Sequence, residues 1–170
     1  MEDEGHPSSA ASSERLHLHT RTEVQDLVAH LLKQAKRRIC VFAPMLPPDL
    51  FNSVQNAKAL AHFAATHRSN RALFLVEDGE KSVQHNGRVV EMCRRLSDFI
   101  EMRRIVEEEI GLQQLWVIVD DSSYLHQRHL DKQDYIARFE AKSEARSLLD
   151  QFERLWERSQ PIHEIHPLGL

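Results

Sequence analysis

Short runs of apolar residues recur along the chain and predict a series of β-strands. Three of these runs, at 39–43, 72–76 and 114–119, are apolar almost throughout. Such runs are typical of strands that are covered on both faces of a sheet. Weaker alternating patterns predict further strands at 15–19, 99–103, 124–127 and 135–139.

Between these runs, apolar residues recur at steps of three and four and predict amphipathic helices. The first helix is expected to open at Thr22, which forms a capping-box pattern with Gln25. A second is expected from an N-cap at Asp49 to about His67. Two further helices are predicted at 86–96 and 143–158.

The order of these elements predicts the fold class. Strands separated by helices favour a largely parallel sheet, and the later strands add antiparallel pairs. We therefore expect an α/β protein with a mixed, mostly parallel sheet and helices on both faces. Residues 15–170 are expected to form a single domain. Residues 1–14 are rich in Ser, Ala and acidic side chains, and we expect them to be disordered.

Composition narrows the possible partners and the compartment. The net charge of -4 gives no general attraction to nucleic acid or to an anionic membrane. Aromatic residues make up 6% of the chain and do not alternate with basic ones, which argues against nucleic-acid binding. No apolar run is long enough to span a bilayer, and no secretory signal is visible. Cys40 and Cys93 both lie in apolar segments, as buried thiols of a reducing compartment do, so we expect a cytoplasmic protein.

Four segments carry a resemblance to a known family. The stretch Ala35–Ile39 with the strand after it, and Val117-Ile118-Val119-Asp120-Asp121-Ser122-Ser123-Tyr124, resemble one half of a phospholipase D-like domain. The segments Ser143–Arg146 and Phe152–Glu157 resemble the closing helix of such domains. More narrowly, the chain is similar to a bacterial family of single-copy phospholipase D-like proteins. Some members of that family occur beside, or fused to, GNAT-type acetyltransferases, which implies a possible acetyltransferase partner.

The resemblance also implies a site, since active members carry His-x-Lys, four residues and then Asp. Histidine attacks phosphorus and lysine holds the phosphoryl oxygens, because alternate residues of a strand face the same side. The second histidine comes from another half, so a single-copy chain is expected to form a homodimer. If Asp120 is the motif Asp, the His and Lys positions hold Gln113 and Leu115. If Asp121 is used instead, they hold Gln114 and Trp116.

Neither alignment supplies a nucleophile or a phosphate-binding cation. The resemblance therefore implies the phospholipase D-like fold without its usual chemistry. We expect a catalytically inactive homodimeric binding or regulatory module. Asp120 and Asp121 can also be explained as turn residues, because Asp side chains bond the amides of a tight turn.

Other residues allow alternative hypotheses. His85 and Arg88 lie between a strand and a helix, where α/β folds place ligands, and with Arg103 they suggest an anion pocket. A phosphodiesterase or another phosphoryl-ligand enzyme with a relocated site would use His85, Arg103 and Asp120. The ligand-binding candidates are His85, Arg88, Arg103, Gln113, Asp120 and Asp121.

Two further clusters have a simpler explanation. Lys33, Lys36, Arg37 and Arg38 crowd the end of the first helix, where they suit the helix dipole or form an anion patch. Three histidine pairs, 17/19, 126/129 and 163/166, have spacings that metal ligands use, but no Cys pair accompanies them and their segments look solvent-facing. We therefore expect neither a metal nor a cofactor.

Overall fold

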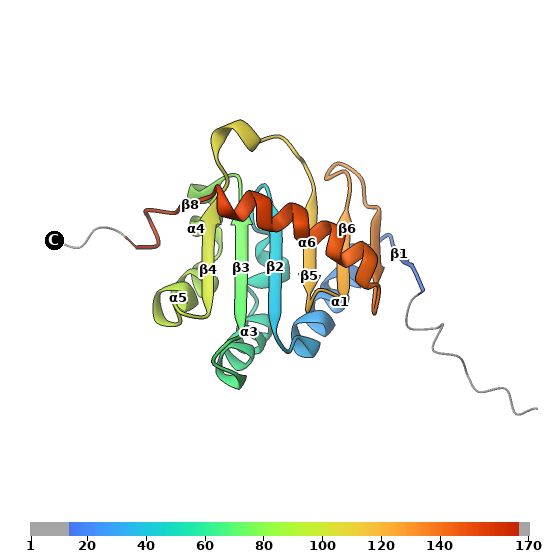
Figure 1. The fold of residues 1–170 in the computed structure, drawn as a ribbon, viewed down its shortest axis with the longest axis horizontal. Coiled ribbons are helices and arrows are strands. Elements are labelled where there is room, and N and C mark those ends of the chain that lie inside the picture. Colours follow the sequence, from blue (N-terminus) through green and yellow to red (C-terminus); the bar gives the residue numbers. More distant parts are fainter. Residues whose placement is uncertain (1–13, 167–170) are drawn as a thin grey trace, which may run out of the picture.

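A computed structural model describes residues 14–166 and contains one mixed eight-stranded sheet. The strands are β1 (Leu16–Leu18), β2 (Arg38–Ala43), β3 (Arg71–Val76), β4 (Ile100–Arg104), β5 (Leu115–Val119), β6 (Ser123–Gln127), β7 (Tyr135–Arg138) and β8 (Gln160–Pro161). Their order across the sheet is β1-β7-β6-β5-β2-β3-β4-β8. Figure 1 shows the long strands running side by side through the middle of the molecule.

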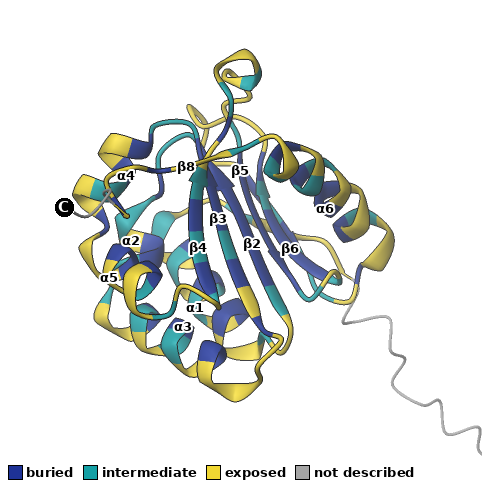
Figure 2. Cartoon of the chain, turned by 60° about the vertical axis from the view of Figure 1, so that its left-hand side comes forward, coloured by how far each residue is buried: buried dark blue, intermediate teal, exposed yellow. Residues whose placement is uncertain are grey.

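Helices cover both faces of the sheet, as the sequence predicts. The helices are α1 (Arg21–Gln34), α2 (Pro48–Phe51), α3 (Val54–Thr66), α4 (Gly79–His85), α5 (Gly87–Arg95) and α6 (Lys142–Glu157), with a 3₁₀ turn at Glu107–Glu109. The first five pack on one face, and α6 crosses the other face alone (Figure 1). Figure 2 shows the buried strands between these two layers and the exposed outer sides of the helices.

Side-chain alternation along the strands divides the core into two clusters. In β2, Ile39 and Val41 face α1–α5, whereas Cys40 and Phe42 face α6. In β5, Leu115 likewise joins the α1–α5 cluster. Because successive strand residues point to opposite faces, a strand buried on both sides must be apolar at every position. This requirement explains the unbroken apolar runs of the sequence.

The prediction of a mostly parallel sheet is wrong. Only β2–β3 and β3–β4 are parallel among the seven strand pairs. The helical crossovers α2–α3 and α4–α5 keep those three strands parallel. The chain then returns as β5 on the free side of β2 and continues through hairpins, which are antiparallel by construction.

Several predicted helix boundaries are also wrong, for local reasons. The cap of α1 is Thr20, whose hydroxyl accepts from the Glu23 amide and donates to its carboxylate. The helix expected at 49–67 is interrupted after α2, because Ser53 caps a new helix by accepting from the Asn56 amide. No helix is predicted at 79–85, where α4 lies, and β8 forms just after the predicted end of the last helix.

The expected disordered tail at 1–14 falls, apart from Glu14, outside the described residues. No helix in the described part of the chain combines the length and the apolar character needed to cross a lipid bilayer.

Candidate functional site

Strand β5 places the two motif positions at the sheet edge where β2 and β3 end. The β2–β5 pair is antiparallel, so the start of β5 lies beside the end of β2. Leu115 is 1% exposed and packs into the α1–α5 cluster. Gln113 is exposed, just before the strand, with a backbone φ of 50°. The position expected to hold a phosphate-binding lysine is therefore occupied by a core residue.

A cleft of about 510 Å³ lies at this edge, and we call it the edge cleft. It is lined by Arg21, Ala43, Pro44, Met45, Pro47, Leu115, Gln127, Leu130, Asp131, Gln133 and Tyr135. No histidine or lysine is among these residues.

The single cation of that lining, Arg21, is already engaged. Its guanidinium donates to both carboxylate oxygens of Asp49, at 2.6 and 2.8 Å, and to the Tyr135 hydroxyl at 3.0 Å. The same contact holds the pKa of the Asp49 carboxyl below its usual value, despite partial burial. The edge cleft therefore has neither the histidine nucleophile of the phospholipase D-like motif nor an uncommitted cation for phosphoryl oxygens.

The second possible alignment of the motif leads to a structural cluster on the α6 face. The side-chain oxygen of Gln114 lies 2.8 Å from Trp116 Nε1 and 2.9 Å from His126 Nε2. An indole nitrogen can only donate, so the amide oxygen must face it, and His126 must then carry its proton on Nε2. Gln114 is thus hydrogen-bonded to its neighbours in the sheet, and Trp116 packs in the core cluster that α6 covers.

Burial sets the charge state of His126. Desolvation first, and Arg128 second, lower the pKa of its imidazole to about 4. The expectation that this histidine is solvent-facing is wrong, because the side chain is half-buried against Trp116. Within residues 14–166, no three His, Cys, Asp or Glu side chains are grouped to hold a metal ion.

Asp120 lies at the opposite edge of the sheet, in the β5–β6 turn. Its carboxylate accepts from the backbone amides of Lys36, Arg37 and Arg38, the closest at 2.7 Å. Asp120 and Asp121 have φ values of 56° and 57°, which Asp tolerates better than most residues. The carboxylate ties the β5–β6 turn to the segment that joins α1 to β2. Asp121 is exposed beside Arg37, Lys142 and Arg146.

The remaining candidates lie on opposite faces of the sheet. His85 ends α4, and Arg88 donates to Asn52 at the end of α2, both on the α1–α5 side. Arg103 lies on the α6 side, 2.6 Å from a Glu101 oxygen and with its guanidinium 4.8 Å from the Trp156 ring centre. Asp120 is at a third location. The structure therefore does not bring His85, Arg103 and Asp120 together.

Solved structures show which class of fold this is. Nuc, a phospholipase D family member from Salmonella typhimurium, superposes with a TM-score of 0.65 at 13% identity, covering 88% of this chain and 97% of that one. NucT from Helicobacter pylori gives a TM-score of 0.60 at 10% identity, covering 88% and 99%. TrmBL2, an archaeal chromatin protein, gives 0.64 at 9% identity, covering 92% of this chain and 57% of that one. The fold is phospholipase D-like, as the sequence predicts.

Sequence comparison then assigns the family. The chain belongs to the family described as a domain of unknown function, DUF7931, which matches residues 20–168. No curated protein matches the sequence.

The contacts of Asp120 lead to a stability prediction. Asp120→Asn keeps a residue that tolerates positive φ but removes the charge that three amides share. We expect the free energy of unfolding to fall by roughly 1–2 kcal/mol, as when a charged acceptor is lost. Urea denaturation measures this change. Asp121→Asn is the matched control, and an equal loss in both variants would show that the turn itself, and not the carboxylate contact, carries the effect.

His126 leads to a prediction about pH. Its folded pKa of about 4 lies below the ordinary 6.5, so the unfolded chain takes up this proton first as the pH falls. We therefore expect stability to decline from pH 6.5 towards pH 4, and His126→Phe to reduce the decline between pH 6.5 and 5. Imidazole NMR shifts in the native protein should show neutral His126 above about pH 4. Titration of His126 near pH 6.5 would contradict the burial argument.

Proposed function

We propose that this protein is a non-catalytic phospholipase D-like module that forms a homodimer and acts in binding or regulation. The observation that carries the proposal is the burial of Leu115 at the position where active members hold a phosphate-binding lysine. A lysine side chain there would have to enter an apolar core, which is costly without a partner. The lining of the edge cleft supports the same conclusion, since its cation is bound to Asp49.

Exposed apolar side chains support dimerisation at the same edge. Of the five large hydrophobic residues exposed in the described chain, three are Ile110, Leu112 and Leu130. They lie on the β4–β5 and β6–β7 connections, which project from one edge of the sheet (Figure 1). We call these three residues the apolar rim. Leu130 lines the edge cleft, whereas Ile110 lines a different hollow with Pro161 and Ile162. Exposed apolar groups at one end of the sheet can mark a protein–protein contact.

The geometry of a rim-to-rim dimer fits the fold. In a two-fold dimer a patch on one copy contacts the same patch on the other copy, so the interface would contain six apolar side chains, three from each copy. Such a dimer would also cover the edge cleft of each copy and close both to solvent. The module would then retain the pairing of a phospholipase D-like protein without forming a reactive centre.

The first test is size-exclusion chromatography with light scattering at micromolar concentration, with a phosphodiesterase assay on the same peak. We expect twice the chain mass and no hydrolysis of bis(p-nitrophenyl) phosphate. Hydrolysis that disappears in His85→Ala would instead favour the relocated-site enzyme. A monomeric chain at this concentration would contradict the dimer.

The rim itself can be tested by charge. Ile110→Glu places a charge in the proposed interface, and like charges would then face each other across the two-fold axis. We expect this variant to elute as a folded monomer. Val54→Glu is the matched control, because Val54 is equally exposed, at 51%, but lines a hollow between α3 and α5. Dissociation of both variants would show that the effect is not specific to the rim.

A further inference from the structure

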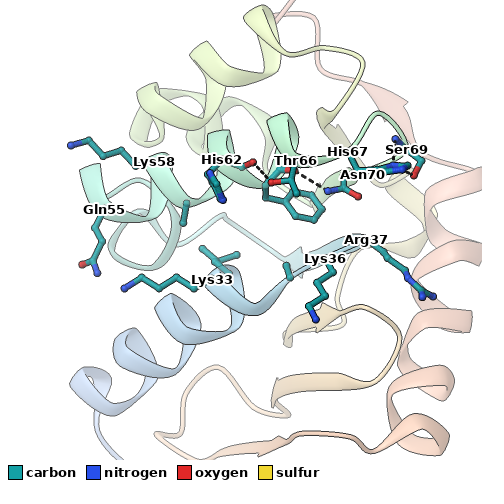
Figure 3. A pocket seen from close by; sticks show the side chains of 14 residues that line it. Lys33, Lys36, Arg37, Gln55, Lys58, His62, Thr66, His67, Ser69 and Asn70 are labelled. Atoms are coloured by element: carbon teal, nitrogen blue, oxygen red, sulfur yellow. Dashed lines mark hydrogen bonds between the residues drawn. The ribbon is translucent and has the colours of Figure 1, made fainter.

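A hollow lies between α1 and α3, and we call it the α1–α3 groove. Its volume is about 960 Å³. It opens near the starts of β2 and β3, at the end of the sheet away from the edge cleft. Figure 3 shows Lys33 on one side, Gln55 and Lys58 on the other, and Arg37 at the far end.

The floor of the groove is apolar and is formed by residues of the two helices. Leu32 and Ala35 line it from the α1 side, and Ala59 and Phe63 from α3. Leu32 and Phe63 are almost fully buried, whereas the two alanines are partly exposed. The small alanine side chains leave the hollow open, because a larger residue at either position would fill it.

The opening of the α1–α3 groove carries basic side chains that have no acidic partner. Lys33, Lys36, Arg37 and Lys58 are all exposed, and none of them forms a salt bridge with any residue of 14–166. The lining contains no carboxylate. The nearby Asp120 carboxylate binds the backbone amides of Lys36 and Arg37 and not their side chains.

Helix dipoles explain the positions of only some of these basic side chains. Lys33 lies in the last turn of α1, where a cation is favoured by the partial negative charge of the helix end. Lys58 lies in the N-terminal half of α3, where the dipole gives it no such benefit. Its presence opposite Lys33 therefore calls for another explanation, and an anionic ligand between the two helices provides one.

The shape and chemistry of the groove indicate the class of ligand. Its volume suits one small molecule, and small-molecule sites are concave, mostly apolar and supplied with a few polar groups. Its only aromatic residue other than the histidines, Phe63, is 2% exposed and offers no face on which a nucleobase could stack. We propose that the α1–α3 groove binds a small anionic amphiphile. Its phosphate or carboxylate head lies between Lys33 and Lys58, and its apolar body lies over Ala35 and Ala59.

This site is separate from the apolar rim, so its test does not depend on the dimer. The probe is decyl phosphate below its micelle concentration, added to the full-length protein. Binding is measured by calorimetry and mapped by amide NMR shifts. We expect one site per chain, shifts centred on residues 32–37 and 55–70, and weaker binding as the salt concentration rises. Inorganic phosphate alone should bind much more weakly than decyl phosphate, because it lacks the apolar body.

Two pairs of variants test the head and the body of the ligand. Lys58→Glu should weaken decyl phosphate binding by about fivefold or more, whereas Lys81→Glu, an equal charge change on α4, should alter it by less than about twofold. Ala59→Leu should fill the floor and abolish binding, whereas Ala61→Leu on the opposite side of α3 should not. Melting temperatures confirm that each variant is folded.

The remaining outcomes are distinguishable. Vesicles containing phosphatidylglycerol that bind the wild type but not Lys58→Glu would identify a lipid headgroup as the source of the anion. Failure of such vesicles, with decyl phosphate still bound, would identify a free ligand. Equal weakening in Lys58→Glu and Lys81→Glu would overturn the site. Tighter binding of a single-stranded oligonucleotide at the same residues would overturn the amphiphile in favour of nucleic acid.

Discussion

The burial of β5 on both faces is the constraint on which the rest of the structure depends. Strand β5 joins the parallel half of the sheet to the antiparallel half by pairing with β2 on one side and β6 on the other. All five of its residues are buried, so its sequence must be apolar on both faces. Polar chemistry can enter only at its two ends. At one end lie the surface residue Gln113 and the core residue Leu115, and at the other the acidic side chain of Asp120 contacts the backbone.

The sequence predicts the buried strands well because their composition reflects burial on two faces. It also predicts α6, whose single apolar stripe covers one cluster of the core. It fails where a local hydrogen bond decides the outcome. Ser53 starts a new helix inside a continuous helical pattern. After β4 the chain crosses back to place β5 beside β2, and no local sequence signal predicts this crossing. The direction of each strand after β4 depends on which strand it pairs with, and sequence periodicity does not predict that pairing.

The candidate site is predictable to a similar extent. The motif spacing alone identifies Gln113 and Leu115, because a strand fixes which residues share a face. The role of Asp120 needs the fold, since its three amide partners lie more than eighty positions earlier in the chain. The α1–α3 groove is half visible in the sequence as the basic run at 33–38. Lys58 comes to lie beside that run only when α3 packs beside α1. The periodicity of a helix does not show which other helix it packs against.

The two ends of the sheet differ in how their charges are satisfied, and this difference supports separate roles for them. At the edge cleft, Arg21 is neutralised by Asp49, and the exposed lining residues include the apolar Leu130 together with Asp131 and Gln133. At the α1–α3 groove, the lining includes four cations and no carboxylate, in a chain whose net charge is negative. Positive charges that line one groove repel each other. None of these cations is paired with one of the carboxylates found elsewhere on the described surface. A ligand that supplies the missing negative charge would turn this unfavourable cluster into a stabilising contact, whereas the edge cleft offers no comparable gain.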